Sequence, residues 1–308
     1  MKIKHILVDI DPTKDSQPAL TKAIALAKAY DASIELLLVA HEEGFLSQVF
    51  LGEEQRELAR LHYMETKRKW LNVYLDLVDS VDVDVSYDVV WNKSICAGIL
   101  EKVEKSNVDL VVKSTHRHPM INKALFTPTD WQLLTTCPVP LLLAKTGTAP
   151  SYKNILAAVD PMRQRNKPAE LDQVILKTTE QLADKLTAAA KVIHCYEPVG
   201  LELWQDMGAG MHGFSFSNEQ YKDYTQKLEK HHQDQFNNLL NDYHFSEDSR
   251  FLVEGVAHTQ LVNTVAEKEV DLLVLGTTFK PGLLGTTSEK ILDNIDCDLL
   301  AVKADEGI

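Results

Sequence analysis

Short apolar runs alternate with longer amphipathic stretches along the whole chain. The short runs are rich in Val, Ile and Leu and alternate little with polar residues, as in parallel strands covered on both faces. The alternation predicts βαβ units and a parallel sheet, so the fold class is α/β. Strands are predicted at 4–10, 34–40, 83–90, 109–113 and 140–144, and again at 153–159, 189–195, 250–254, 271–275 and 298–302. Helices are predicted at 17–30, 53–78, 94–106 and 126–135, and again at 169–186, 218–241, 258–268 and 286–294.

The second half of the chain repeats the first. Residues 4–12 read KHILVDIDP and return at 153–161 as KNILAAVDP, at an offset of 149. Residues 109–112, DLVV, return at 271–274 as DLLV, at an offset of 162. A repeat this long indicates a duplicated domain. We therefore expect two domains, 1–147 and 151–308, joined by a small turn-rich linker, and the positions where the copies differ carry the functional information.

Length and charge narrow the class of protein. A chain of 308 residues fits two domains of about 150 residues each. The net charge of -13 argues against nucleic acid and anionic membranes as partners, since both attract clustered Lys and Arg. No apolar run approaches the roughly 18 residues of a spanning helix, and the N-terminus has no signal-peptide pattern. We therefore expect a cytoplasmic protein.

Cysteine and histidine spacing predicts no metal site. The four cysteines form no CxxC pair and sit in or beside apolar segments, which predicts buried thiols. Histidines occur close together at 116 and 118, at 231 and 232, and beside a cysteine at 194, without metal-site spacing. Hydrogen-bonded or solvated imidazoles are the favoured interpretation.

Ligands of an open parallel sheet bind beyond the carboxyl ends of the strands, where the strand order reverses. Two segments of each half should meet there. One is the end of the first strand, at Asp11-Pro12 and Asp160-Pro161. The other is the loop after the fourth strand, at 114–129 and 276–288.

The loop of the second half reads GTTFKPGLLGTTS from residue 276 to 288. Glycines let backbone N–H groups approach phosphate oxygens, and hydroxyls at a helix N-terminus add donors where the helix dipole favours an anion. A Gly-rich turn followed by a Thr or Ser helix cap is the alternative, and on the loop alone it is favoured. The candidate ligand-binding residues are Asp160, Pro161, Gly276, Thr277, Gly282, Gly285, Thr286, Thr287 and Ser288.

The matching loop of the first half has lost every glycine. Ser114 stands in place of Gly276, and Lys113 stands in place of a leucine. Side chains here can fill the space that a phosphate would need. We hypothesise that Lys113 reaches Asp9 or Asp11, which share one face of the first strand because strand side chains alternate with period two.

Several segments resemble the universal stress protein family, most of all its tandem E-type bacterial members. They are the opening strand of each half, the strands PVPLLL at 138–143 and DLLAVK at 298–303, and above all FTPTDW at 126–131 and CDLL at 297–300. The resemblance covers nearly the whole chain. It implies a five-stranded parallel sheet of order 3-2-1-4-5 in each half, so two tandem doubly wound domains, packed pseudo-symmetrically in a stress-induced cytoplasmic protein.

Nucleotide-binding members of this family share a loop of the form G-x2-G-x9-G-[ST]. Gly276 matches its first glycine, and Gly285 with Thr286 match its final pair. Phe279 replaces the second glycine, and the spacer encloses five residues instead of nine. Asp160 matches the adenosine-contacting aspartate, as Asp11 does in the first half. The resemblance thus implies a partial nucleotide loop for ATP in the second domain and a degenerate loop in the first.

A GxGxxG pattern at 208–213 lies within an insertion at 197–217 and does not join a strand to a helix, so we interpret it as a flexible loop, a lid or interface rather than a dinucleotide site. Nothing nominates a nucleophile with its base. The leading hypothesis is a stress protein that binds a small molecule in its second domain, with the first domain packed on the second and a homodimer as a possible assembly. The alternatives are a weak ATP hydrolase, for which Asp160 is the one carboxylate at hand, and an interaction scaffold that binds no ligand.

Overall fold

The computed structural model of the protein describes residues 1–41, 52–78, 82–118, 123–125, 127–145, 147–162, 170–200, 203, 217–277 and 294–304. Side chains are described for the same residues except 76–78, 116–118 and 123–125. Most of the predicted insertion at 197–217, with its GxGxxG pattern, and most of the predicted helix at 286–294 lie outside these residues.

Strands and helices alternate in the first half close to the predicted bounds. They run in the order β1 His5–Asp9, α1 Pro18–Tyr30, β2 Ser33–Ala40, α2 Glu53–Val78, β3 Val85–Trp91, α3 Ile95–Ser106, β4 Leu110–His118, β5 Lys123–Leu125, α4 Pro128–Thr136 and β6 Leu141–Lys145. The second half repeats this order. Its elements are β7 Asn154–Val159, α5 Leu171–Leu186, β8 Ala189–Tyr196, α7 Asn218–Leu240, β9 Arg250–Glu254, α8 Ala257–Glu267, β10 Leu272–Gly276 and β11 Asp298–Val302.

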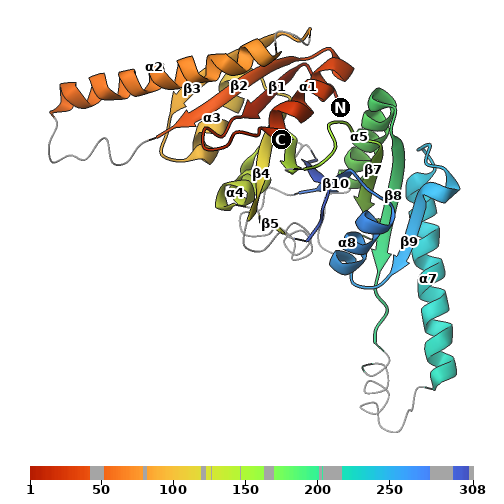
Figure 1. Ribbon diagram of the computed structural model, residues 1–308. Coiled ribbons are helices and arrows are strands. Elements are labelled where there is room, and N and C mark those ends of the chain that lie inside the picture. The colour runs from red at the N-terminus through yellow and green to blue at the C-terminus, as the bar shows by residue number, and fades with distance from the viewer. Residues whose placement is uncertain are drawn as a thin grey trace.

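The sheet order confirms the expected doubly wound fold in both halves. The strands lie in the order β3-β2-β1-β4-β6 in the first half and β9-β8-β7-β10-β11 in the second, which is the order 3-2-1-4-5 twice. Every neighbouring pair within these two series is parallel. The outer strands β3 and β9 end the sheet, with the long helices α2 and α7 beside them (Figure 1).

Helices cover both faces of the sheet. Strand side chains alternate between the faces, so Ile6 and Val8 join one apolar core and Leu7 joins the other. The first core takes residues from α1, α2, α5 and α7, and the second takes residues from α3, α4 and α8. Each core therefore runs through both halves.

The first helix begins at Pro18, one residue after its predicted start, with Gln17 at the N-cap position. One local expectation was wrong. The fourth strand does not end at residue 113, because β4 continues through His118 and pairs antiparallel with the short β5. Residues 114–118 lack the apolar run that marks the other strands, so the sequence carried no signal for this extension.

The two halves join edge to edge through antiparallel pairing of β6 with β11, in which Leu142 lies opposite Leu300. This joint was not predicted. A lysine from each half reinforces it. Lys145 Nζ donates to the carbonyl oxygen of Ile295, and Lys303 Nζ donates to the carbonyl oxygens of Thr135 at 3.0 Å and Cys137 at 2.6 Å. Thr135 and Ile295 both lie two residues before a cysteine of the repeated segment, so the contacts are reciprocal.

A buried ion pair also crosses the joint. Lys22 Nζ of α1 lies 3.0 Å from Asp298 Oδ2 of β11, and the two residues are 1% and 0% exposed. Asp298 also accepts hydrogen bonds from the Tyr152 hydroxyl and from the Lys145 backbone N–H, each at 2.8 Å. Lys22 lies 4.2 Å from the centre of the Tyr152 ring and donates to the Ala149 carbonyl. These contacts fix α1 of the first half against the last strand of the second.

The cysteines are free thiols: Cys96, Cys137 and Cys297 are buried and Cys195 is partly buried, as expected. Burial raises the pKa of Cys195 and of Cys297 to about 12, so both are held as protonated thiols. No helix in the described part of the chain is long and apolar enough to cross a membrane.

Candidate functional site

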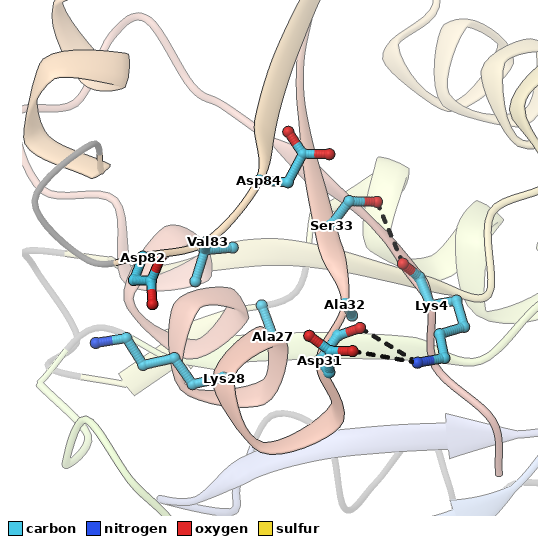
Figure 2. A pocket seen from close by; sticks show the side chains of 9 residues that line it. All are labelled: Lys4, Ala27, Lys28, Asp31, Ala32, Ser33, Asp82, Val83 and Asp84. Atoms are coloured by element: carbon cyan, nitrogen blue, oxygen red, sulfur yellow. Dashed lines mark hydrogen bonds and ion pairs between the residues drawn. The ribbon is translucent and has the colours of Figure 1, made fainter.

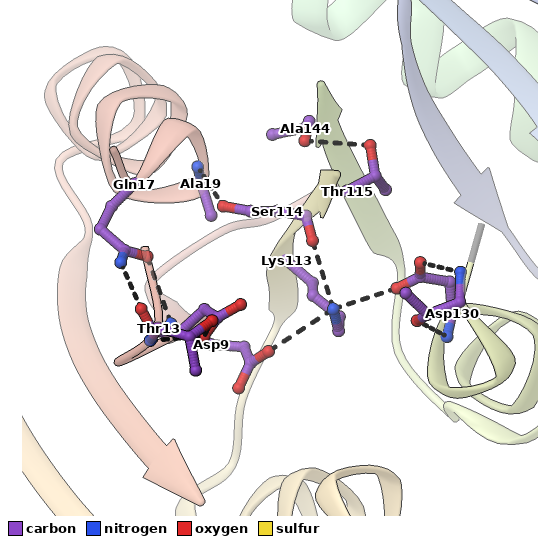
Figure 3. Close-up of polar contacts among 11 residues, drawn as sticks. Asp9, Thr13, Gln17, Ala19, Lys113, Ser114, Thr115, Asp130 and Ala144 are labelled. Carbon is purple, nitrogen blue, oxygen red and sulfur yellow. Dashed lines mark hydrogen bonds and ion pairs between the residues drawn. The ribbon is translucent and has the colours of Figure 1, made fainter. Parts of the chain in front are cut away.

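In the first half, a buried lysine occupies the expected ligand-binding edge. Lys113 of β4 lies with its Nζ 3.1 Å from Asp130 Oδ1 and 3.8 Å from Asp9 Oδ2, and donates to the Ser114 carbonyl at 3.2 Å (Figure 3). The predicted contact with Asp9 is therefore confirmed. Burial alone would lower the pKa of Lys113, but the charges of Asp9, Asp130 and Asp11 outweigh it and raise the pKa. The ammonium is thus held charged, inside the protein.

Asp130 is a partner that the sequence analysis did not identify. It stands in the first turn of α4, where Thr127 is the N-cap. Asp130 Oδ2 accepts from the Thr127 backbone N–H at 2.8 Å, and the Thr127 hydroxyl accepts from the Asp130 backbone N–H at 3.2 Å. The spacing Thr-x-x-Asp is the available signal for this reciprocal cap. The cap aims a fully buried carboxylate at Lys113.

The remaining polar groups of this edge are also engaged. Ser114 Oγ accepts from the Ala19 backbone N–H at 3.0 Å, one of the donors at the start of α1 that a helix leaves unpaired. Asp11 Oδ1 accepts from both the backbone N–H and the hydroxyl of Thr13, at 2.8 and 2.7 Å. Gln17 Oε1 accepts from the Asp11 backbone N–H at 3.2 Å. Internal contacts thus engage Ser114, Asp11 and Gln17 at this edge.

In the second half, Asp160 follows β7 and forms the same kind of turn as Asp11. Its Oδ1 accepts from the Met162 backbone N–H at 3.2 Å, and Pro161 lies in this turn. Its own backbone N–H donates to Asp172 Oδ1 of α5 at 3.1 Å, as the Asp11 N–H donates to Gln17. Asp172 is 4% exposed and was not identified from the sequence, where it reads only as an acidic residue of a first helical turn.

The charged residues that fill the first edge are apolar in the second copy. By the repeat offsets, Asp9 corresponds to Ala158 and Lys113 corresponds to Leu275. Leu275 is buried in the second core. The second edge therefore has no counterpart of the Lys113–Asp9 pair.

Gly276 has a packing role that the sequence did not show. A Cβ at this residue would lie 2.5 Å from Leu171 Cδ2 and 2.6 Å from Leu171 Cγ, so only glycine fits beneath α5. The glycine is explained by helix–strand packing, and its suggested role near a phosphate remains a prediction.

Thr277 carries a hydroxyl that differs between the two copies. Its backbone N–H donates to the Val302 carbonyl at 2.8 Å, while its buried Oγ1 has no hydrogen-bond partner among the residues that the structure describes. The corresponding Thr115 donates its hydroxyl to the Ala144 carbonyl at 3.3 Å. Strand β10 pairs with β7 so that Val274 lies beside Ala157, and Thr277 and Asp160 each follow three residues later in the sequence.

The other predicted ligand-binding residues lie outside the described part of the chain. They are Gly282, Gly285, Thr286, Thr287 and Ser288. The structure therefore brings together Asp160, Pro161, Gly276 and Thr277 at one edge of the sheet, as predicted from the order of the strands.

A pocket of about 700 Å³ lies at the opposite edge of the first half (Figure 2). It is open at the amino ends of the strands, where Lys4 precedes β1 and Asp84 precedes β3. Lys4 Nζ lies 3.8 Å from Asp31 Oδ2, and both side chains are exposed. Mixed, solvated charge here does not favour a particular ligand, and the strand ends that carry Asp11 and Lys113 face the other way.

The described residues hold no group of three or more His, Cys, Asp or Glu side chains placed to bind a metal ion. Of the two adjacent histidines in α7, His231 is exposed and His232 is buried, so they point apart as expected.

The sequence model of the universal stress protein family matches residues 2–145 and again residues 151–303. The chain is 28% identical over 312 residues to the Universal stress protein E homolog of Haemophilus influenzae, with 98% of each chain covered. It is 24% identical over 308 residues to Universal stress protein E of Escherichia coli K12, covering 98% of this chain and 95% of that protein.

Solved structures show the same fold. A functionally unknown protein from Pseudomonas aeruginosa PAO1 matches with a TM-score of 0.73 at 22% identity, covering 99% of this chain and 94% of its own. A universal stress protein from Archaeoglobus fulgidus matches with a TM-score of 0.65 at 12% identity, covering 97% and 98%. A universal stress protein in complex with cAMP covers 50% of this chain with a TM-score of 0.30, which is too weak a match to assign a ligand here.

Proposed function

The chain belongs to the universal stress protein family, and we propose that it is a stress-response protein whose second domain binds an adenine nucleotide while its first domain is closed to ligands. Both halves match the family, and the similarity to E-type members spans nearly the full length of the chain. The proposal concerns the ligand, the domain that binds it and the division into domains 1–147 and 151–308.

The observation that carries this proposal is the contrast between the two threonine hydroxyls. The Thr115 hydroxyl is hydrogen-bonded to the Ala144 carbonyl, whereas the Thr277 hydroxyl is buried after the end of β10, the strand beside β7, without a partner in the described residues. A buried polar group without a partner costs free energy, about 1–3 kcal/mol, and a ligand oxygen accepting from this hydroxyl would recover it. The Lys113 network that fills the first edge has no counterpart in the second.

The proposed ligand contacts follow from the chemistry of the residues. The Asp160 carboxylate can accept hydrogen bonds from ribose hydroxyls, which are neutral donors. Backbone N–H groups around Gly282 and Gly285, with the hydroxyls of residues 286–288, would hold phosphate oxygens at the start of the helix that the sequence predicts at 286–294. We propose binding without turnover, because hydrolysis needs a base or metal at the phosphate, and the role we assign to Asp160 is at the ribose.

Two matched variants test the proposal. Thr277→Val and Thr115→Val remove the same hydroxyl from the two copies. Isothermal titration with ATP should show saturable binding to the wild type, about tenfold weaker binding to Thr277→Val, and unchanged binding to Thr115→Val. Absence of binding, or equal losses in both variants, would contradict it. Steady phosphate release from ATP that Asp160→Ala abolishes would favour the hydrolase instead.

We further propose that the protein acts in the cytoplasm. Four cysteines persist as free thiols, three of them buried, which suits a reducing compartment. Fluorescence microscopy of a tagged full-length chain, or fractionation of the source cells, checks this.

A further inference from the structure

Two histidines from distant parts of the second half form a buried pair behind the end of β7. His194 of β8 and His232 of α7 lie with Nε2 of the first 2.8 Å from Nδ1 of the second. They are 1% and 2% exposed. The ring nitrogen Nδ1 of His194 lies 3.3 Å from the carbonyl oxygen of Val159, the residue directly before Asp160.

Elementary hydrogen-bond chemistry fixes the protons of the neutral pair. A carbonyl oxygen only accepts, so Nδ1 of His194 carries the hydrogen and donates it to Val159. In a neutral imidazole the other nitrogen is then an acceptor, so Nδ1 of His232 donates to Nε2 of His194. The neutral pair thereby forms a directed chain from α7 through β8 to the backbone at the end of β7.

An aromatic ring lies beside each of the two histidines. The His232 ring stacks on the Tyr196 ring with centres 4.9 Å apart, and the Phe236 ring lies 5.8 Å from that of His194. At the strand position that corresponds to His194, the first half has no histidine. Ser33 lies beside His5 as Ala189 lies beside Asn154, so Leu38 holds the position of His194 in the first copy. The pair is thus confined to the domain that we propose binds the nucleotide.

The charges around the pair come from four elements. Burial is the largest effect on the pKa of His232 and lowers it; the neighbouring His231 lowers it further, and Asp160 at the end of β7 opposes both. Asp172 of α5 is hydrogen-bonded to the Asp160 backbone. The charges of Glu229 on α7 and Glu254 on β9 raise the pKa of Tyr196, the aromatic neighbour on β8. Asp160 is the carboxylate that senses the charge of His232 directly.

We infer that His194 and His232 are positioning residues for Asp160, and that proton uptake by this pair weakens binding of the nucleoside part of the ligand. The inference rests on the proposed function, in which Asp160 accepts from the ligand. In the neutral pair the directed hydrogen bonds hold the backbone at the end of β7, next to Asp160, and the pair carries no positive charge that competes with the ligand for this carboxylate.

A proton added to the pair introduces a positive charge near Asp160. It goes to Nε2 of His232, because this leaves the bonds to His194 and Val159 intact. The resulting imidazolium attracts the Asp160 carboxylate and competes with the ligand hydroxyls for it. Since the pKa of His232 lies below the ordinary 6.5, the change takes place below pH 6.5. Binding is therefore constant near neutrality and falls in acid.

The experiment compares ATP affinity from pH 7.5 to 5.0 in the wild type and in His194→Leu/His232→Phe. The double variant copies Leu38 of the first half and adds an aromatic ring to the stack. The titration of ATP itself is common to both proteins. We expect the wild type to lose at least about fivefold more affinity in acid than the double variant.

His231→Gln should keep the loss of affinity and move its midpoint to higher pH, because a repelling charge beside His232 is removed. Equal pH profiles in all three proteins would overturn the inference.

A second measurement does not depend on nucleotide binding or on the variants folding. In ¹⁵N-labelled wild type without ligand, the ring nitrogens of His232 report its protonation and the Asp160 amide reports its surroundings. We expect the Asp160 amide to shift with the midpoint of His232. If His232 takes up a proton and the Asp160 amide does not respond, the inference is wrong. If instead they shift together but ATP never binds, the proposed function fails and the coupling of the pair to Asp160 stands.

Discussion

Lys113 lies 3.1 Å from Asp130, at the place where the second copy of the domain has Leu275. The carboxylate is fully buried, and it is held at the N-terminus of α4 by the cap with Thr127, where the helix dipole favours a negative charge. The Lys113 ammonium therefore neutralises the Asp130 carboxylate, which the N-terminus of α4 holds inside the protein. This pair, with Asp9 3.8 Å away, makes the first edge self-contained.

Replacing this lysine should destabilise the first domain strongly. Lys113→Leu copies the second domain but leaves Asp9 and Asp130 buried without a cation, which costs about 3–5 kcal/mol of unfolding free energy. Lys105→Gln removes a lysine from an exposed pair with Glu101 and should leave the free energy of unfolding nearly unchanged. Urea denaturation followed by circular dichroism measures both. Equal stabilities of the two variants would show that Lys113 is not needed to hold the edge closed.

Gly276 should be intolerant of a side chain for a reason unrelated to any ligand. Gly276→Ala forces Leu171 to move and should cost about 1–3 kcal/mol, since overpacking strains a close-packed core. Gly200→Ala is the matched control, because no atom lies within 4 Å of a Cβ there. If Leu171→Ala in addition to Gly276→Ala recovers none of the loss, the steric account of Gly276 is refuted.

The ion pair between Lys22 and Asp298 should couple the two halves energetically. Lys22→Met leaves a buried carboxylate without its cation and should cost about 3–5 kcal/mol. In a double-mutant cycle with Asp298→Asn, the coupling energy should exceed about 0.5 kcal/mol. The exposed pair of Lys4 with Asp31 serves as the control cycle and should show almost none. Thermal denaturation of the single and double variants supplies the numbers, and additive effects for the buried pair would contradict the account.

Lys303 should make stability depend on alkaline pH. Burial lowers its pKa to about 8 in the folded protein, against 10.5 for an ordinary lysine. Between these values the unfolded chain binds more protons than the folded one, so raising the pH stabilises the fold through this group. The stability of the wild type relative to Lys303→Met should therefore increase from pH 7.5 to 9.5.

The comparison with Lys303→Met also separates this effect from that of two lysines whose raised pKa values make stability decrease with rising pH. Carboxylates hold the pKa of Lys113 and of Lys102 above the ordinary value despite burial, and both are unchanged in the variant. Urea titrations at three pH values suffice. A difference that is flat or decreases with pH would mean that Lys303 is not desolvated at the joint.

The fold was predictable because the buried strands carry their signal locally. The run of Ile6, Leu7 and Val8 is apolar on both faces, and its copy at 155–157 repeats the signal, so element order and domain duplication follow from the sequence. The joint between β6 and β11 did not follow. Leu142 and Leu300 look like interior strand residues whichever strand lies beside them. Strand partners across domains depend on three-dimensional closeness, which period and composition do not encode.

The candidate site was predictable only for residues on adjacent parallel strands or at the ends of those strands. The Lys113–Asp9 contact followed from adjacent parallel strands and period-two alternation. Asp130, Asp172 and His232 lie on helices whose packing positions are set by tertiary structure, so the sequence did not show that they meet Lys113, the Asp160 backbone and His194. The sequence allowed two interpretations of Gly276, a phosphate-binding loop or a Gly-rich turn. The distance to Leu171 shows a third role, close packing of α5 on β10.

The most direct test of the central claim is the stoichiometry of ATP binding in two equivalent variants. Asp11→Asn and Asp160→Asn alter the corresponding aspartate in each copy. The account predicts one site per chain in the wild type, unchanged in Asp11→Asn and lost or at least about tenfold weaker in Asp160→Asn. Two sites per chain, or one site that is lost in Asp11→Asn and kept in Asp160→Asn, would contradict it.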